Sequence, residues 1–160
     1  QEKKKRPLSG VQLLSSIPFR SLLSPSYFHS FAMTERHFVF VEQPFKLDLV
    51  KLATAYARGV TLGSCLRFDK DDITLFHVIS RETGKAVSTR FYGDALVVFH
   101  HVNAYEEDGH VVVDLVSYED CNLYDMFYLE NLRTDAFAHA HRRFSPPVCQ
   151  RFVLPLAAHT

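Results

Sequence analysis

The chain has 160 residues, a length typical of one domain. Its 18 Lys and Arg residues balance 18 Asp and Glu residues, which gives no electrostatic basis for nucleic acid or an anionic membrane as the main partner. Hydrophobic residues make up 47% of the chain, enough for a packed core, so disorder throughout is excluded.

The cysteine count and the lack of a recognisable leader motif favour a location in the cytosol. Three cysteines, an odd number without a C-x-x-C pair, argue against a disulfide framework and for reducing surroundings. No apolar run approaches the roughly 18 residues that a spanning helix needs. The basic cluster at 3–6 is expected to be a solvated tail, with a targeting patch as the alternative. We therefore expect a cytosolic protein.

The first part of the chain is expected to be a basic, Ser-rich connecting segment over residues 1–24, followed by a β-rich domain over residues 25–160. Within that domain, residues 27–31 and 37–41 have the aromatic and β-branched character of strands, with a polar break between them.

A short helix is expected after Pro44. Asp48 is suited to cap its start, and Gly59 to end it. The apolar side chains that recur at the spacing of one helix face are Leu49, Leu52, Ala53 and Tyr56.

The rest of the chain has the regular strand spacing of an antiparallel meander, such as a propeller blade or barrel wall. The expected strands, joined by Asp- and Gly-rich turns, are residues 73–79, 86–92, 95–102, 111–116 and 151–156. Residues 124–132 favour helix over strand, and 137–147 favour a loop. Such a meander would leave two open sheet edges, so we expect a part of a larger closed architecture.

The common catalytic signatures are missing, including nucleophile elbow, phosphate-binding and zinc-protease motifs. Histidine is the informative residue type, with nine copies. His139 and His141 have metal-pair spacing, but their polar, Pro-rich surroundings favour exposed surface. His77, in an apolar strand, is expected to be a hydrogen-bonded structural imidazole.

His29 and His100 have different surroundings, because each interrupts an aromatic or aliphatic strand. An imidazole there costs free energy unless both ring nitrogens find partners. The pattern alone leaves a core histidine and a metal ligand as alternatives.

Two segments around these histidines, 24–31 (SPSYFHSF) and 99–109 (FHHVNAYEEDG), resemble motifs of the carotenoid cleavage oxygenases. Three further segments, in the same order, strengthen the resemblance and extend it over most of the chain: 41–48 (VEQPFKLD), 51–56 (KLATAY) and 123–129 (LYDMFYL). Ala32 departs from the family, where Gly is frequent, but it does not touch a matched histidine.

The resemblance implies a mainly β fold that is part of a seven-bladed β-propeller, with iron(II) held on its axis by four histidines. Matched motif by motif, His29 and His100 fall on two of the four ligands, and His101 does not. The other two ligands and the glutamates that support them lie outside these residues, so this chain alone is expected to be inactive. Imidazole suits iron(II), and four neutral ligands leave the ion its full charge.

The implied activity is cleavage of a carotenoid by dioxygen, at the central 15,15′ double bond of β-carotene to give retinal. Alternatives are eccentric cleavage, retinoid isomerohydrolysis on the same scaffold, and a non-catalytic carotenoid-binding module. Tyr27 and Phe31, which would share the face of His29 in a strand, and Tyr118 are candidates to line the substrate cavity, with wall packing as the alternative. A membrane-borne substrate implies transient contact with a membrane surface.

Overall fold

The computed structural model describes residues 10–135, 139 and 145–156. Its strands are β1 (Ala32–Met33), β2 (His37–Glu42), β3 (Phe45–Leu47), β4 (Leu66–Phe68), β5 (Thr74–Ser80), β6 (Phe91–Gly93), β7 (Val97–Glu107), β8 (His110–Tyr118) and β9 (Val148–Pro155). Its helices are α1 (Leu49–Arg58), η1 (Gly63–Cys65), η2 (Asn122–Phe127) and α2 (Leu129–Arg133).

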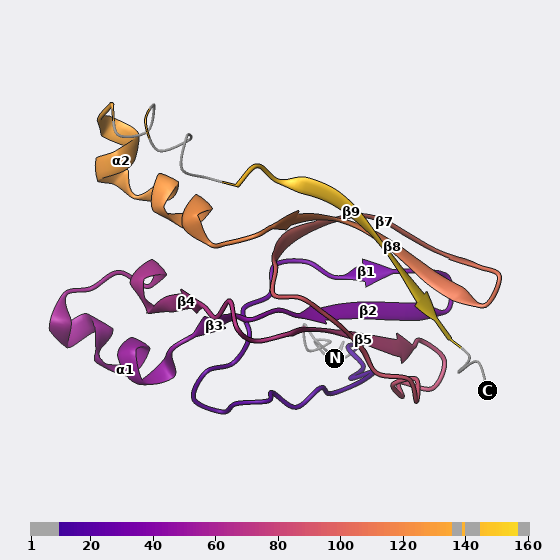
Figure 1. The fold of residues 1–160 in the computed structure, drawn as a ribbon. Coiled ribbons are helices and arrows are strands. Elements are labelled where there is room, and N and C mark those ends of the chain that lie inside the picture. Colours follow the sequence, from indigo (N-terminus) through magenta and orange to yellow (C-terminus); the bar gives the residue numbers. More distant parts are fainter. Residues whose placement is uncertain (1–9, 136–138, 140–144, 157–160) are drawn as a thin grey trace, which may run out of the picture.

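Three antiparallel sheets organise these strands, in the orders β1-β2-β5-β6, β3-β4 and β7-β8-β9. The β7-β8-β9 sheet lies across the β1-β2-β5 sheet, while the small β3-β4 sheet and α1 extend to one side (Figure 1). Apolar side chains from both larger sheets form one core, in which Val39, Val113 and Leu115 are fully buried. Period-2 alternation in β2, β5 and β8 supplies this buried face.

The helix and the main hairpin form as the sequence predicts. The Asp48 carboxylate accepts a hydrogen bond from the Lys51 amide at 2.8 Å, and Gly59 ends α1 with φ of 61°. The expected buried face is wrong in part, because Ala55 is buried while Tyr56 is fully exposed. The spacing defines an apolar face, but no described residue covers Tyr56. The β7–β8 turn has positive φ at Asp108 and Gly109, as a tight two-residue hairpin requires.

Two expected strands do not form in full. Residues 27–30 belong to no strand, and only the preceding residue, Ser26, makes an isolated bridge to Lys46. Within residues 86–92, Ala86 makes an isolated bridge to Ile79, and only the last two residues belong to a strand, β6. The cause is the same in both, since strand propensity depends on a neighbouring strand being in reach. The loop expected over 137–147 and the residue His141 fall largely outside the described residues.

The segment before β1 is tied to the sheets although, over residues 10–24, it forms no helix or strand. Arg20 donates to Glu42 at 2.9 Å and to Asp72 at 3.0 Å. Lys46 adds an ion pair to Asp72 at 2.5 Å. The backbone of this segment also meets β3, where the Leu47 amide donates to Pro25. These contacts fix the segment that precedes His29 against the sheets.

Glu106 joins β7 to the turn before β2. Its carboxylate accepts hydrogen bonds from Thr34, from His37 at 3.0 Å and from the Arg36 side chain at 2.6 Å. Burial alone would raise its pKa, but these hydrogen bonds outweigh burial and lower the pKa from 4.5 to about 2. The charged form is therefore favoured by folding.

This lowered pKa predicts a loss of stability in acid. Because the folded pKa lies below the unfolded one, the stabilisation is complete above pH 4.5 and is lost as the pH falls toward 2. Glu106→Gln should flatten the pH dependence of the urea midpoint of the complete protein in this window. Some slope should remain, because the pKa values of Asp72 and Glu42 are also lowered. An unchanged slope, matching that of the exposed control Glu107→Gln, would contradict this role.

Candidate metal centre

The fold brings His29 and His100 together from segments 71 residues apart in the numbering. Their ring centroids are 5.2 Å apart and the rings are perpendicular. His29 lies in the unpaired stretch before β1, and His100 lies in β7 where pairing with β8 is irregular. Both side chains are exposed, so nothing in the described chain buries them away from a ligand.

The ring nitrogens of this pair fit metal ligation. His29 Nδ1 lies 3.1 Å from the Tyr27 hydroxyl oxygen. With the proton on Nδ1 donated to that oxygen, the Nε2 lone pair is left for a metal. In the described chain no hydrogen bond engages either nitrogen of His100. Two imidazoles bound to one ion through bonds of about 2.1 Å place their ring centres about 5 Å apart, close to the observed separation.

The pair is an incomplete site. Among the described residues there is no group of three or more His, Cys, Asp or Glu that could hold a metal. His29 and His100 can therefore supply two donors, and further ligands must come from residues beyond the described ones.

His101, next to His100, has different surroundings. Its Nδ1 lies 2.8 Å from Ser30 Oγ, and its Nε2 is buried without a hydrogen-bond partner in the described chain. Burial lowers the pKa of His101 to about 4, so the ring is neutral at neutral pH. The two neighbouring histidines thus face different environments, as alternation along a strand leads one to expect.

An aromatic cluster packs against the His29 ring. The Phe99 ring is 5.8 Å from the His29 ring and packs edge-on against Tyr27 and Tyr118. Phe45 and Tyr124 complete the cluster. Two of the candidate cavity residues, Tyr27 and Tyr118, lie here. Phe99 is not among the cavity residues predicted from the sequence, although its position beside His100 in an apolar strand is a usable signal.

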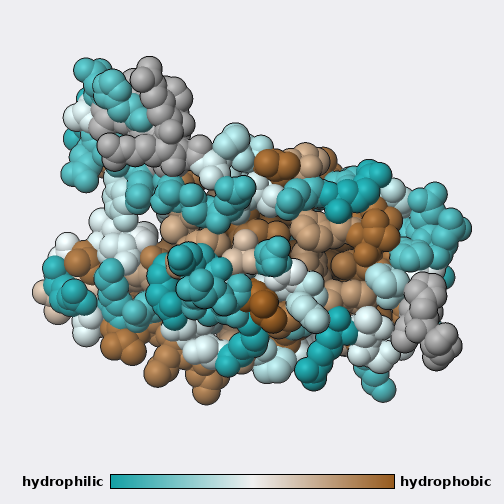
Figure 2. All heavy atoms as spheres, viewed as in Figure 1, coloured by the Kyte–Doolittle hydropathy of each residue, from teal (hydrophilic) through white to brown (hydrophobic). Residues whose placement is uncertain are grey.

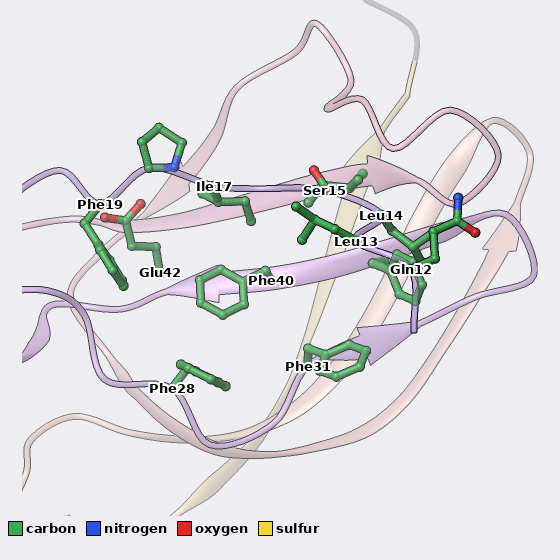
Figure 3. Close-up of a pocket in the computed structure, with 13 residues that line it drawn as sticks. Gln12, Leu13, Leu14, Ser15, Ile17, Phe19, Phe28, Phe31, Phe40 and Glu42 are labelled. Carbon is green, nitrogen blue, oxygen red and sulfur yellow. The ribbon is translucent and has the colours of Figure 1, made fainter. Parts of the chain in front are cut away.

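Phe31 lies elsewhere, because residues 27–31 do not form the expected strand. Its ring packs against Phe38 at 5.9 Å, and it lines a separate apolar cavity of about 560 Å³. Figure 3 shows Phe28, Phe31 and Phe40 facing the segment that carries Leu13 and Leu14 across this cavity. Neither His29 nor His100 lines it. A place for Phe31 beside His29 on the substrate cavity stays a prediction.

A family model described as RPE65, retinal pigment epithelial membrane protein, matches residues 3–160. The chain belongs to this family. It is 60% identical to the β,β-carotene 15,15′-dioxygenase of Gallus gallus over 156 residues. The matched region covers 98% of this chain and 30% of that relative. The human enzyme of the same name is 52% identical, over 95% of this chain and 28% of its own length. A human mitochondrial carotenoid-cleaving dioxygenase is 35% identical, over 93% of this chain and 26% of its own length. The chain thus spans less than a third of the length of these relatives.

Solved structures of Synechocystis ACO and of an ACO/RPE65 chimera share the fold. A cobalt-substituted Synechocystis ACO matches with a TM-score of 0.65 and 25% identity, over 84% of this chain and 26% of its own. An ACO/RPE65 chimera matches with a TM-score of 0.64 and 26% identity, with the same coverage. A point mutant of Synechocystis apocarotenoid oxygenase matches with a TM-score of 0.63 and 24% identity, over 82% of this chain and 25% of its own. The expected mainly β, antiparallel fold of this propeller family is confirmed.

Of the other histidines of this RPE65-family chain, His77 has structural surroundings. His77 Nε2 lies 2.7 Å from the Glu42 carboxylate, which is only 3% exposed and also bonded to Arg20. Burial would raise the pKa of Glu42, but His77 and Arg20 outweigh it and lower the pKa. The expectation of a hydrogen-bonded His77 is confirmed. His139 is exposed, as expected, while His141 lies outside the described residues.

Proposed function

We propose that the complete protein containing this chain cleaves a carotenoid with iron(II) and dioxygen, at the central 15,15′ double bond of β-carotene. The observation that carries the proposal is the contact between the His29 and His100 rings, in a chain 52–60% identical to relatives named β,β-carotene 15,15′-dioxygenase. In this reaction one C=C bond and one O=O bond break, and two aldehydes form. Each aldehyde takes one oxygen atom, so β-carotene gives two molecules of retinal.

The residues of this chain have three roles in the proposal. His29 and His100 hold two positions of the metal, and Tyr27 orients His29 through Nδ1. When bound, iron(II) would supply binding and activation of dioxygen. The cluster around Phe99 and Tyr118 offers the apolar and aromatic surface that a polyene can recognise. Two further histidines and their supporting glutamates, on a seven-bladed propeller, would come from the rest of the protein.

Three alternatives differ in what they produce. Eccentric cleavage would use the same centre on another double bond, and isomerohydrolysis would act on a retinoid ester. A carotenoid-binding module would catalyse nothing. The identity of 52–60% to the central-cleaving relatives, against 35% to a carotenoid-cleaving mitochondrial relative, favours central cleavage.

Product analysis of the complete protein supplied with β-carotene separates these functions. Retinal as the only aldehyde is the expected result, with label from ¹⁸O₂ in the aldehyde oxygen. Two carbonyl products of unequal length would contradict central cleavage. In a parallel reaction supplied with a retinyl ester, turnover there alone would support the isomerohydrolase. Binding without any product would support the binding module.

Location and membrane contact complete the proposal. In the described chain, no helix is long and apolar enough to span a membrane. We place the protein in the cytosol, with transient contact to the membranes that hold its substrate. Hydrophobic side chains gather on the face formed by the segment before β1 and by α1 (Figure 2), including Leu22, Leu23 and Val50. This surface is the candidate for the contact.

A further inference from the structure

Ser30 connects the His29 segment to the peptide groups on both sides of His100. Its hydroxyl donates a hydrogen bond to the Phe99 carbonyl at 2.7 Å. The same oxygen accepts one from the His101 backbone amide at 3.2 Å. Ser30 directly follows His29, and Phe99 and His101 directly precede and follow His100. The Ser30 side chain therefore links the His29 segment to both neighbours of His100.

Gln43 makes a second connection, two residues before each histidine. Its side chain is 2% exposed and its amide nitrogen donates to the carbonyls of Tyr27 and Val98, each at 3.0 Å. Its amide oxygen accepts from the Val98 backbone amide at 2.7 Å. All of these bonds go to backbone groups of the two histidine segments. Each histidine is therefore held on both sides by the same two side chains.

Ordinary sheet pairing is irregular at this point. The β7–β8 register shifts between Val98 and His100, and again between His101 and Asn103. A bulged residue is left out of the ladder, and here the Phe99 carbonyl is bonded by Ser30 instead. Residues 27–30 also lack a strand partner. The ladders alone do not fix the distance between His29 and His100.

We propose that Ser30 and Gln43 are positioning residues that set the spacing of the His29–His100 pair, and through it the affinity and geometry of the bound metal. This inference rests on the proposed function. Groups that hold a metal ligand in place are typically worth 10–100-fold in affinity. A loss of that size is expected when the Ser30 hydroxyl is removed.

The test uses the complete protein with Ser30→Ala, Ser30→Thr and, as the matched control, Ser117→Ala. Ser117 is buried in β8 and donates to the Gln150 side chain and the Val148 carbonyl, but these bonds reach β9 and not the histidines. Iron affinity is measured by competition with a chelator, the coordination by X-ray absorption at the iron edge, and the fold by thermal unfolding. Gln43→Met removes the second connection in the same assays.

Ser30→Ala should weaken iron binding about tenfold or more and alter the edge spectrum, while Ser30→Thr keeps the hydroxyl and restores both. Ser117→Ala should lower the unfolding temperature similarly without changing iron affinity. Equal iron affinity and an identical edge spectrum in Ser30→Ala and the unmodified protein would overturn the proposal.

A His29→Ala variant separates the two proposals. If it loses iron while Ser30→Ala does not, the positioning role is wrong and the metal centre stands. If the unmodified protein binds no iron, or His29→Ala keeps it, the metal centre is wrong and the positioning role falls with it.

Discussion

Replacing either His29 or His100 by alanine in the complete protein is expected to reduce carotenoid turnover by more than about 100-fold and to remove most bound iron. The groups that merely hold a ligand in place are worth about 10–100-fold, so loss of the ligand itself should exceed that. The two rings are 5.2 Å apart, so either change leaves the other histidine alone in this part of the site. Iron per chain by mass spectrometry and initial rates of retinal formation measure the effect.

Three other histidines are the controls for this prediction. His101→Ala, His139→Ala and His141→Ala should keep iron content close to that of the unmodified protein. The His101 comparison is the most informative, because its buried Nε2 has no hydrogen-bond partner in the described chain. If His101→Ala lost iron and activity while His100→Ala kept both, the assignment of the ligand in β7 would be off by one residue.

Leu115→Ala is expected to have the largest effect on stability, lowering the free energy of unfolding by about 2–5 kcal/mol. Leu115 is fully buried in β8, between the β7-β8-β9 sheet and the β1-β2-β5 sheet. Truncation removes apolar contacts and leaves a cavity that the packed sheets cannot close. Urea unfolding of the complete protein, followed by circular dichroism, measures the loss.

Val153→Ala is the matched control, because Val153 lies in the neighbouring strand β9 but is 54% exposed. Its expected effect is within about 0.5 kcal/mol, as for most surface substitutions. A loss for Leu115→Ala no larger than for Val153→Ala would contradict the placement of the core between these two sheets.

Local chemistry explains why parts of this fold could be predicted from the sequence. Asp48 and Gly59 delimit α1 because a capping carboxylate and a left-handed glycine act within one turn. Asp108 and Gly109 determine the β7–β8 hairpin because both adopt positive φ. Strands β5 and β8 follow from their alternation and their polar boundaries. In each case the information lies within a few residues.

The parts that could not be predicted depend on partners far along the chain. Residues 27–31 have strand character, yet they are unpaired and are held by Gln43 and by β7. In that arrangement the Phe31 ring packs against Phe38 and lines the apolar cavity. No short pattern indicates that the Ser30 hydroxyl and the Gln43 amide bond to backbone around the histidines. The pairing of His29 with His100 came from the family motifs, and the contact between their rings from the structure.

Anomalous diffraction at the iron edge, from crystals of the complete protein grown with iron(II), tests the central claim most directly. We predict one iron peak bonded to both His29 and His100, at about 2.1 Å from a ring nitrogen of each, with the remaining protein ligands from outside this segment. An iron peak away from these two rings, or one bonded to His101 in place of His100, would contradict the account.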